Sequence, residues 1–185
     1  MMNKKITVAI VIPDLKGNGA EKAMLNLANG LIQKNCDIHI IVFKKNIELP
    51  TNMNVPIHEF KWHCRWVPRK IRGYLIAPIL DAFIKKVCSK IPDLVLSNLL
   101  PVDRILAYSK FNVHMVIHST ISEEHNIGNT DKFNIDNIDE LPSIYTKKPC
   151  ICVSKGVMND FKYIFKNHKT KNITYIYNPI DVKEI

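Results

Sequence analysis

The sequence predicts an α/β domain in which helices cover both faces of a doubly wound, mostly parallel β-sheet. Strand-like and helix-like patterns alternate along all 185 residues, which is typical of this fold class. The strand-like runs are continuously apolar and rich in β-branched residues, as in strands that are buried on both faces. No hairpin turn joins neighbouring runs, so we expect crossover connections between parallel strands.

The first elements lie on either side of a glycine-containing turn. Ile6–Ile12 (ITVAIVI) predicts the first buried strand. After the turn, apolar residues from Ala20 to Leu31 recur at helical spacing and give one apolar face. Asp37–Phe43 (DIHIIVF) predicts the second strand, and Pro56–Phe60 a short third one.

The middle of the chain repeats this alternation. Ile71–Val87 has a helical pattern, which Pro78 must kink or divide in two. Asp93–Ser97 (DLVLS) predicts a buried strand, Val102–Lys110 a helix, and Val113–Ile117 (VHMVI) another strand.

The last part begins with Ser119–Leu141, which is polar and predicts a loop with one short helix. Cys150–Val153 predicts a strand, and Ser154 is a natural N-cap for the helix that follows it. Ile173–Tyr177 (ITYIY) is the last predicted strand. Together these elements predict one domain.

The composition is that of a globular protein, with 46% hydrophobic and 23% charged residues. No basic-then-apolar leader opens the chain, and no apolar run approaches the roughly 20 residues of a membrane span. We therefore expect a cytoplasmic protein. The net charge of +9 suits nucleic acid, an anionic membrane face or phosphorylated substrates alike. The five cysteines lack the spacing of a disulfide framework or zinc site, so we expect buried free thiols and no metal.

The turn after the first strand contains Gly17 and Gly19. Ligands of doubly wound sheets bind beyond the carboxyl ends of the strands, and this turn usually contributes. Glycines let the backbone approach a ligand, and the free N–H groups and dipole of the following helix favour an anion. The turn therefore predicts a phosphate-binding site, although glycines before helices also serve as plain turn residues.

Two standard cofactor motifs do not match this turn. Lys22 replaces the third glycine of the dinucleotide motif, and Lys44 and Lys45 stand where an acid would end the second strand. No G-K-[ST] sequence follows, so a Walker motif is absent. The two lysines would suit a 2′-phosphate, which leaves an NADP-dependent reductase as a remote alternative.

Four segments together resemble the family-4 retaining glycosyltransferases of the GT-B fold. "GNGAEKAMLNLANGL", from Gly17, is similar to the family's G-G-A-E-[RK]-x-x-x-x-L-A-x-x-L signature. "VIHST", "ICVSKGVMNDF" and "ITYIYNPID" follow in the family's order and at about its spacing, so the resemblance covers essentially the whole chain. Asn18 stands where the family often has the first glycine of its G-G pair.

The resemblance implies a domain organisation. The family has two Rossmann-like halves that face each other across a cleft, and the N-terminal half mainly receives the acceptor. Residues 1–177 would form this acceptor-side half, and residues 178–185 would begin the linker to a C-terminal, donor-binding half. The family's E-x7-E donor motif does not occur in these residues. We therefore expect the 185 residues alone to be inactive.

The resemblance also implies site residues. Gly17, Asn18, Gly19 and Glu21 would lie at the diphosphate of the nucleotide-sugar donor, although a structural role for Glu21 in the first helical turn is an equal alternative. His118 follows a strand at the same sheet edge and would lie close to the transferred sugar, as the catalytic residue, with a structural loop histidine as the weaker alternative. Neither a cofactor nor a metal is expected.

Polar residues at other strand ends of this edge are candidates for contact with the acceptor. These candidates are Ser97, Asn98 and Ser119.

A basic, aromatic stretch from Lys61 to Leu75 predicts contact with an anionic membrane surface. The expected contact residues are Trp62, Arg65, Trp66, Arg69, Lys70 and Arg72. A loop whose tryptophans fold into the core is an equal alternative, and single-stranded nucleic acid is a weaker one.

The predicted function is the acceptor-binding half of a hexosyltransferase that extends a surface polysaccharide or lipid-linked glycan, with retention of configuration. Its partners would be a nucleotide-sugar donor, a glycan or lipid-linked acceptor, and the inner face of the cell membrane. The alternative of a different class is a non-catalytic membrane-docking subunit that pairs with a separate donor-binding chain.

Overall fold

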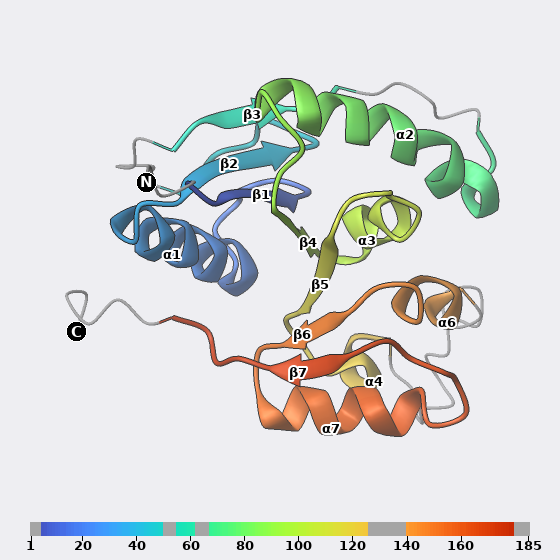
Figure 1. Ribbon diagram of the computed structural model, residues 1–185. Coiled ribbons are helices and arrows are strands. Elements are labelled where there is room, and N and C mark those ends of the chain that lie inside the picture. The colour runs from blue at the N-terminus through green and yellow to red at the C-terminus, as the bar shows by residue number, and fades with distance from the viewer. Residues whose placement is uncertain (1–4, 50–54, 62–66, 126–139, 180–185) are drawn as a thin grey trace.

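A computed structural model describes residues 5–49, 55–61, 67–125 and 140–179. In these residues one seven-stranded sheet forms, and all of its strand pairs are parallel (Figure 1). The strands are β1 (Thr7–Ile12), β2 (Asp37–Val42), β3 (Ile57–Glu59), β4 (Leu94–Asn98), β5 (Val113–Ile117), β6 (Cys150–Cys152) and β7 (Ile173–Tyr175). The described helices are α1 (Gly19–Gln33), α2 (Arg69–Val87), α3 (Leu100–Leu106), α4 (Ile121–Glu124), α6 (Leu141–Tyr145) and α7 (Lys155–Ile164). The predicted fold class is confirmed.

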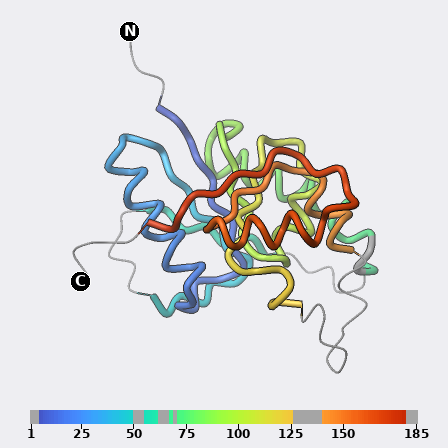
Figure 2. The backbone as a smooth tube through the Cα atoms, turned by 90° about the horizontal axis from the view of Figure 1, so that it is seen from below, coloured from blue at the N-terminus to red at the C-terminus, as the bar shows by residue number. Residues whose placement is uncertain are grey.

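The strand order is β3-β2-β1-β4-β5-β6-β7. The chain runs outward from β1 to β3, returns through α2, and continues from β4 to the opposite edge. Figure 1 shows the early elements, coloured blue, toward one end of the sheet and the orange and red elements toward the other, and Figure 2 views the molecule from the orange and red end. The order therefore reverses between β1 and β4, which is the switch point where such sheets bind ligands.

Both faces of the sheet are covered, as the continuous apolar strands predict. On β1, Val8, Ile10 and Ile12 pack with the buried side of α1. Ala9 and Val11 face the other way, into a cluster that contains α2 and α3. Residues of β5 and β6 form a third cluster with α6 and α7. The alternation along each strand produces these two layers.

α2 runs through Pro78 as a single helix, so the alternative of two helices does not hold. Pro78 is exposed, and water can take up the carbonyl that a proline leaves unpaired. Gly73 explains how closely this helix approaches α3, because a Cβ there would lie 2.1 Å from the carbonyl oxygen of Arg104.

The predicted N-cap of α7 is confirmed, since the Ser154 side chain accepts a hydrogen bond of 3.1 Å from the backbone N–H of Val157. The predicted buried thiols are confirmed for Cys88, Cys150 and Cys152. Burial raises the pKa of the Cys88 and Cys152 thiols to about 11. Cys36 is partly buried, and Cys64 lies outside the described residues.

Candidate functional site at the switch point

The carboxyl ends of three neighbouring strands carry the candidate site. The glycine turn follows β1, Asn98 ends β4, and His118 follows β5. β1, β4 and β5 are adjacent in the sheet, so parallel pairing brings these segments to the same edge. This edge was predicted from the sequence as the ligand-binding end.

Asn98 joins the ends of all three strands. Its side chain is fully buried, and Nδ2 donates to the carbonyl oxygens of Val11 at 3.1 Å and Leu96 at 3.2 Å. Because carbonyls only accept hydrogen bonds, these contacts fix the orientation of the amide. Oδ1 therefore points to His118, whose Nε2 lies 2.9 Å away.

This orientation also determines the tautomer of His118. Oδ1 of Asn98 can only accept, so Nε2 of His118 carries the proton and donates it. Nδ1 is then unprotonated, and its lone pair can accept a hydrogen bond. Burial lowers the pKa of His118 to about 4, which keeps the imidazole neutral at physiological pH.

Nδ1 of His118 is buried, and it has no hydrogen-bond partner among the described residues. A buried acceptor without a partner is costly, so such an atom is a candidate for ligand contact. A hydroxyl group of a ligand would satisfy it. The site thus contains a buried, neutral acceptor of hydrogen bonds next to the sheet edge.

The backbone between Asn98 and α3 is strained. Leu99 has a positive φ of 69°, a region that bulky side chains rarely occupy. Such strain persists only where the surrounding structure holds it, and it gathers at functional sites. Leu99 lines a small pocket together with His118.

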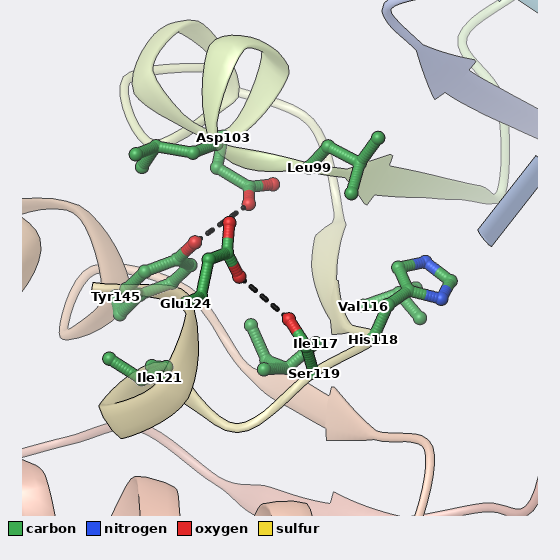
Figure 3. Close-up of a pocket in the computed structure, with 10 residues that line it drawn as sticks. Leu99, Asp103, Val116, Ile117, His118, Ser119, Ile121, Glu124 and Tyr145 are labelled. Carbon is green, nitrogen blue, oxygen red and sulfur yellow. Dashed lines mark hydrogen bonds between the residues drawn. The ribbon is translucent and has the colours of Figure 1, made fainter. Parts of the chain in front are cut away.

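This pocket lies between β5 and the helices α3, α4 and α6 (Figure 3). Its interior, about 10 Å³, has room for about one water molecule. Asp103, Glu124 and Tyr145 converge on one side of it, and His118 stands apart from them. The polar lining is therefore acidic and hydroxylic.

Asp103 is the most enclosed member of this group. Its carboxyl group accepts hydrogen bonds from Ser97 Oγ at 2.5 Å and from the Tyr145 hydroxyl at 3.2 Å. Burial raises the pKa of Asp103 to about 7, although both hydrogen bonds act in the opposite direction. Nearby, Ser119 Oγ donates to Glu124 at 2.7 Å at the exposed rim.

The structure places the three expected acceptor residues differently. Ser119 is exposed beside the pocket. Ser97 and Asn98 have no exposed surface. Both lie below the edge, where Ser97 is hydrogen-bonded to Asp103 and Asn98 to His118. In this structure they hold other site residues and offer no surface to an acceptor.

The glycine turn has the backbone expected of a ligand loop in two respects. Gly17 has a φ of +105°, which a side chain rarely adopts. Gly19 is exposed, and a Cβ there would meet nothing within 4 Å. Backbone hydrogen bonds of Leu15 hold the start of the turn. The Leu15 N–H donates to the carbonyl oxygen of Asn46, and the Leu15 carbonyl oxygen accepts from the N–H of Glu48, both in the segment after β2.

The start of α1 lacks a side-chain cap. Asn18 occupies the N-cap position, but its Nδ2 donates to Glu21 Oε1 at 3.3 Å and its oxygen caps no backbone N–H. Glu21 is buried, and its Oε2 has no hydrogen-bond partner among the described residues. Uncapped N–H groups at the start of a 15-residue helix are suited to an anion.

Asp103, Glu124 and Tyr145 were not predicted as site residues. They come from three helices that are separate in the sequence, and no local motif marks them. The one available signal was the aspartate near the start of the predicted helix Val102–Lys110.

Of the expected membrane contacts, Trp62, Arg65 and Trp66 lie outside the described residues. Arg69 and Lys70 are the first two residues of α2. Arg72 Nε and Nη2 both donate to the carbonyl oxygen of Val67, at 3.1 and 2.8 Å, so its guanidinium group secures the start of the helix.

In the described part of the chain, no helix is both long enough and apolar enough to cross a bilayer. The described residues also contain no cluster of three or more histidine, cysteine or acidic side chains arranged to hold a metal ion. Lys44 and Lys45, the residues considered for a 2′-phosphate, are exposed after β2.

No protein-family model matches the sequence, and no curated protein matches it significantly. Solved structures do match. A glycosyltransferase from Rickettsia africae ESF-5 is 15% identical with a TM-score of 0.55, and the match covers 97% of this chain and 44% of that one. UGT89C1 of Arabidopsis thaliana, complexed with UDP, is 14% identical with a TM-score of 0.54, covering 97% of this chain and 50% of that one.

At these identities the likeness concerns the fold. The chain has a Rossmann-like fold, as predicted, and it is similar in fold to part of each of these two structures. It spans about half the length of these two proteins.

Proposed function

We propose that this chain is the acceptor-side half of a family-4 retaining glycosyltransferase, which transfers a hexosyl group from a nucleotide-sugar. The observation that carries the proposal is the pairing, at one switch point, of an uncapped helix start behind a glycine turn with a neutral, partly unsatisfied histidine. The four resembling sequence segments and the glycosyltransferase fold support it.

The glycine turn would receive the diphosphate of the donor. Phosphate oxygens would approach Gly17 and Gly19, where the absence of side chains leaves the backbone accessible. The N–H groups of α1 would stabilise negative charge as the sugar–phosphate bond breaks. One of the two similar structures is a complex with UDP, which supports a nucleotide ligand of this kind.

His118 would contact the transferred sugar. Its Nδ1 lone pair would accept a hydrogen bond from a sugar hydroxyl, and Asn98 would hold the ring in the required tautomer. A neutral ring suits this task, because a protonated one would repel the positive charge that develops on the sugar.

The acceptor would approach from the side of Ser119 and Glu124, the exposed polar residues at the pocket rim. A carboxylate and a hydroxyl are suitable partners for the hydroxyl groups of a sugar. In the transfer, the bond from the anomeric carbon to the diphosphate would break, a bond to an acceptor oxygen would form, and the acceptor hydroxyl's proton would pass to the departing nucleoside diphosphate. We propose a surface-polysaccharide or lipid-linked glycan as the acceptor, at the inner face of the membrane.

The second half of such an enzyme would grip most of the donor, so these 185 residues alone would bind it weakly and transfer little. Residues 1–177 would be the acceptor-side domain, with the linker starting at residue 178. No resident metal or cofactor is part of the proposal.

The test is a titration of the ¹⁵N-labelled chain with UDP, and with pyrophosphate as a probe without a base, followed by amide chemical shifts. We expect the largest shifts at the turn residues 17–21. Gly19→Asp should abolish them, because it places a carboxylate where the phosphate would lie. The variant should still fold, since the space at Gly19 is open and an acid suits the first turn of a helix.

The matched control is Gly30→Asp, on the same helix, where a Cβ also meets nothing within 4 Å. It should bind UDP as the wild type does. Shifts that are absent from the turn, or that survive Gly19→Asp, would contradict the proposed donor site.

A further inference from the structure

Asn18 has the backbone of a helix N-cap residue but does not cap α1. Its φ and ψ are −74° and 173°, and its carbonyl oxygen accepts the first helical hydrogen bond, from the N–H of Lys22 at 3.1 Å. An asparagine in this position normally accepts with its side-chain oxygen from the N–H of the second or third helical residue. In α1 these residues are Ala20 and Glu21, and the Asn18 side chain bonds to neither N–H group.

The Glu21 carboxylate accounts for the missing cap. Its Oε1 accepts a hydrogen bond from Asn18 Nδ2 at 3.3 Å. Because an ionised carboxylate only accepts, the amide of Asn18 must turn its nitrogen toward Glu21. Asn18 is exposed, so packing does not fix this orientation, whereas Glu21 is buried. The hydrogen bond to Glu21 therefore keeps the Asn18 oxygen from capping the helix.

This arrangement lowers the stability of the start of α1 in two ways. The cap is lost, and Oε2 of the buried Glu21 has no hydrogen-bond partner among the described residues. Both features disfavour the folded state. An acid in the first turn interacts favourably with the helix dipole, but that interaction requires neither feature. Features that break the rules of stability in this way are typical of functional sites.

α4 shows the same pairing with an anion in place. Its N-cap residue, Thr120, likewise donates to the acid three residues later, from Oγ1 to Glu123 Oε2 at 2.6 Å, and does not cap the helix. Asp160 of α7, which lies beside α4 in Figure 1, instead accepts with Oδ2 from the N–H groups of Ile121 and Ser122, at 2.7 and 3.2 Å. A carboxylate from another helix thus binds where the N-cap side chain is turned away.

α1 has the same open start without such a carboxylate. Its first helical hydrogen bond comes from Lys22, so the N–H groups of Gly19, Ala20 and Glu21 have no acceptor within the helix. No hydrogen bond from elsewhere in the described part of the chain reaches these three groups. They are therefore suited to an anion that comes from outside the described residues.

We propose that Glu21 is a positioning residue: through Asn18 it keeps the first N–H groups of α1 free to bind a phosphate of the nucleotide-sugar. This inference rests on the proposed function, and it gives Glu21 a role that needs no contact with the donor. The charge of Glu21 itself opposes an anion. The test therefore has to separate the charge of this side chain from its hydrogen bond.

The test compares two uncharged replacements of Glu21. Glu21→Gln keeps an oxygen that can accept from Asn18 Nδ2, whereas Glu21→Ala leaves the Asn18 side chain free to cap the helix. The probe is pyrophosphate, and its dissociation constant is measured by titration of the ¹⁵N-labelled proteins. Hydrogen exchange of the amides of residues 20 and 21, without pyrophosphate, reports the cap. Circular dichroism checks that each variant is folded.

Glu21→Ala should bind pyrophosphate about fivefold more weakly than Glu21→Gln, because the phosphate must first displace a cap of ordinary strength. Amide exchange at residue 20 or 21 should also be slower in the alanine variant. Adding Asn18→Gly to Glu21→Ala removes the competing side chain and should restore the affinity of Glu21→Gln. The matched control is Glu123→Ala, which breaks the corresponding pair at α4 and should bind pyrophosphate as the wild type does.

Equal affinities of the alanine and glutamine variants would overturn the proposal, because Glu21 would then act through its charge alone. So would an affinity that Asn18→Gly does not restore. If no protein, the wild type included, binds pyrophosphate at the turn, the proposed donor site fails. In that case slower amide exchange in Glu21→Ala would still support the control of the cap by Glu21, and unchanged exchange would overturn it.

Discussion

Acid should destabilise this protein partly through His118. The side chain has a pKa of about 4 in the folded protein because burial disfavours the imidazolium, against 6.5 for an unperturbed histidine. Above pH 6.5 the histidine is neutral in both the folded and the unfolded protein, so it does not lower the free energy of unfolding. As the pH falls from 6.5 toward 4, the unfolded protein binds a proton that the folded protein does not, and the free energy of unfolding decreases.

The size of this loss follows from the two pKa values. Each unit of separation is worth about 1.4 kcal/mol once the pH lies below both values. Between about pH 7.5 and about pH 5, the loss attributable to His118 is about 2 kcal/mol in the free energy of unfolding. The replacement His118→Gln removes the titration but keeps a side-chain N–H that can donate to Asn98.

The assay is urea unfolding of both proteins at the two pH values. Other groups titrate in this range, including His58 and His114, whose pKa values are also lowered by burial. Their contributions are common to both proteins and cancel in the comparison. The wild type should lose about 2 kcal/mol more than His118→Gln between the two pH values. Equal losses would refute the buried, neutral histidine on which the site depends.

Three further predictions concern the fold and the pocket. Gly73→Ala should lower the free energy of unfolding by about 2 kcal/mol or more, because its Cβ would meet the Arg104 carbonyl at 2.1 Å; an unchanged urea midpoint would contradict this close approach. Ser154→Ala should cost about 1 kcal/mol through the lost cap of α7, with Ser154→Asp as the control that keeps a cap. Asp103 has a raised pKa of about 7, against 3.8, so its stabilising proton is lost as the pH rises through 7. Between about pH 5 and pH 8, the free energy of unfolding of the wild type should therefore fall by about 2–3 kcal/mol more than that of Asp103→Asn. An equal fall in the two proteins, measured by urea unfolding, would contradict the raised pKa of Asp103.

Much of the fold was predictable because each strand carries its own signal. Runs such as Ile6–Ile12 and Val113–Ile117 are largely apolar on both sides, and this pattern is typical of strands in a sheet that is covered on both faces. The glycine turn and His118 were predictable for a related reason, since parallel strands bring their carboxyl ends to one edge.

The contacts within the site were not predictable in the same way. Ser97 and Asn98 sit at a strand end and are polar, so the sequence favoured contact with a ligand, but both point into the protein. Their partners, Asp103 and Val11, are brought to them by packing between separate elements. Local pattern carries no information on such pairings.

The helix α2 shows a second limit. Apolar residues of Ile71–Val87 occur on more than one side of the helix, so the pattern predicts a helix but does not say which side the core takes. Only the packing of Ile76 and Leu80 against the sheet leaves Leu75 and Ile79 in water.

The most direct test of the central claim is an assay of sugar transfer by the complete product of the gene that encodes this chain. Purified protein would be incubated with a panel of nucleotide-sugars and with glycan or lipid-linked acceptors, and the anomeric configuration of the product followed by proton NMR. We expect transfer with retention, strongly reduced by Gly19→Asp and by His118→Gln but not by Gly30→Asp. A folded protein that transfers no sugar from any donor, or whose transfer is unaffected by Gly19→Asp, would contradict the account.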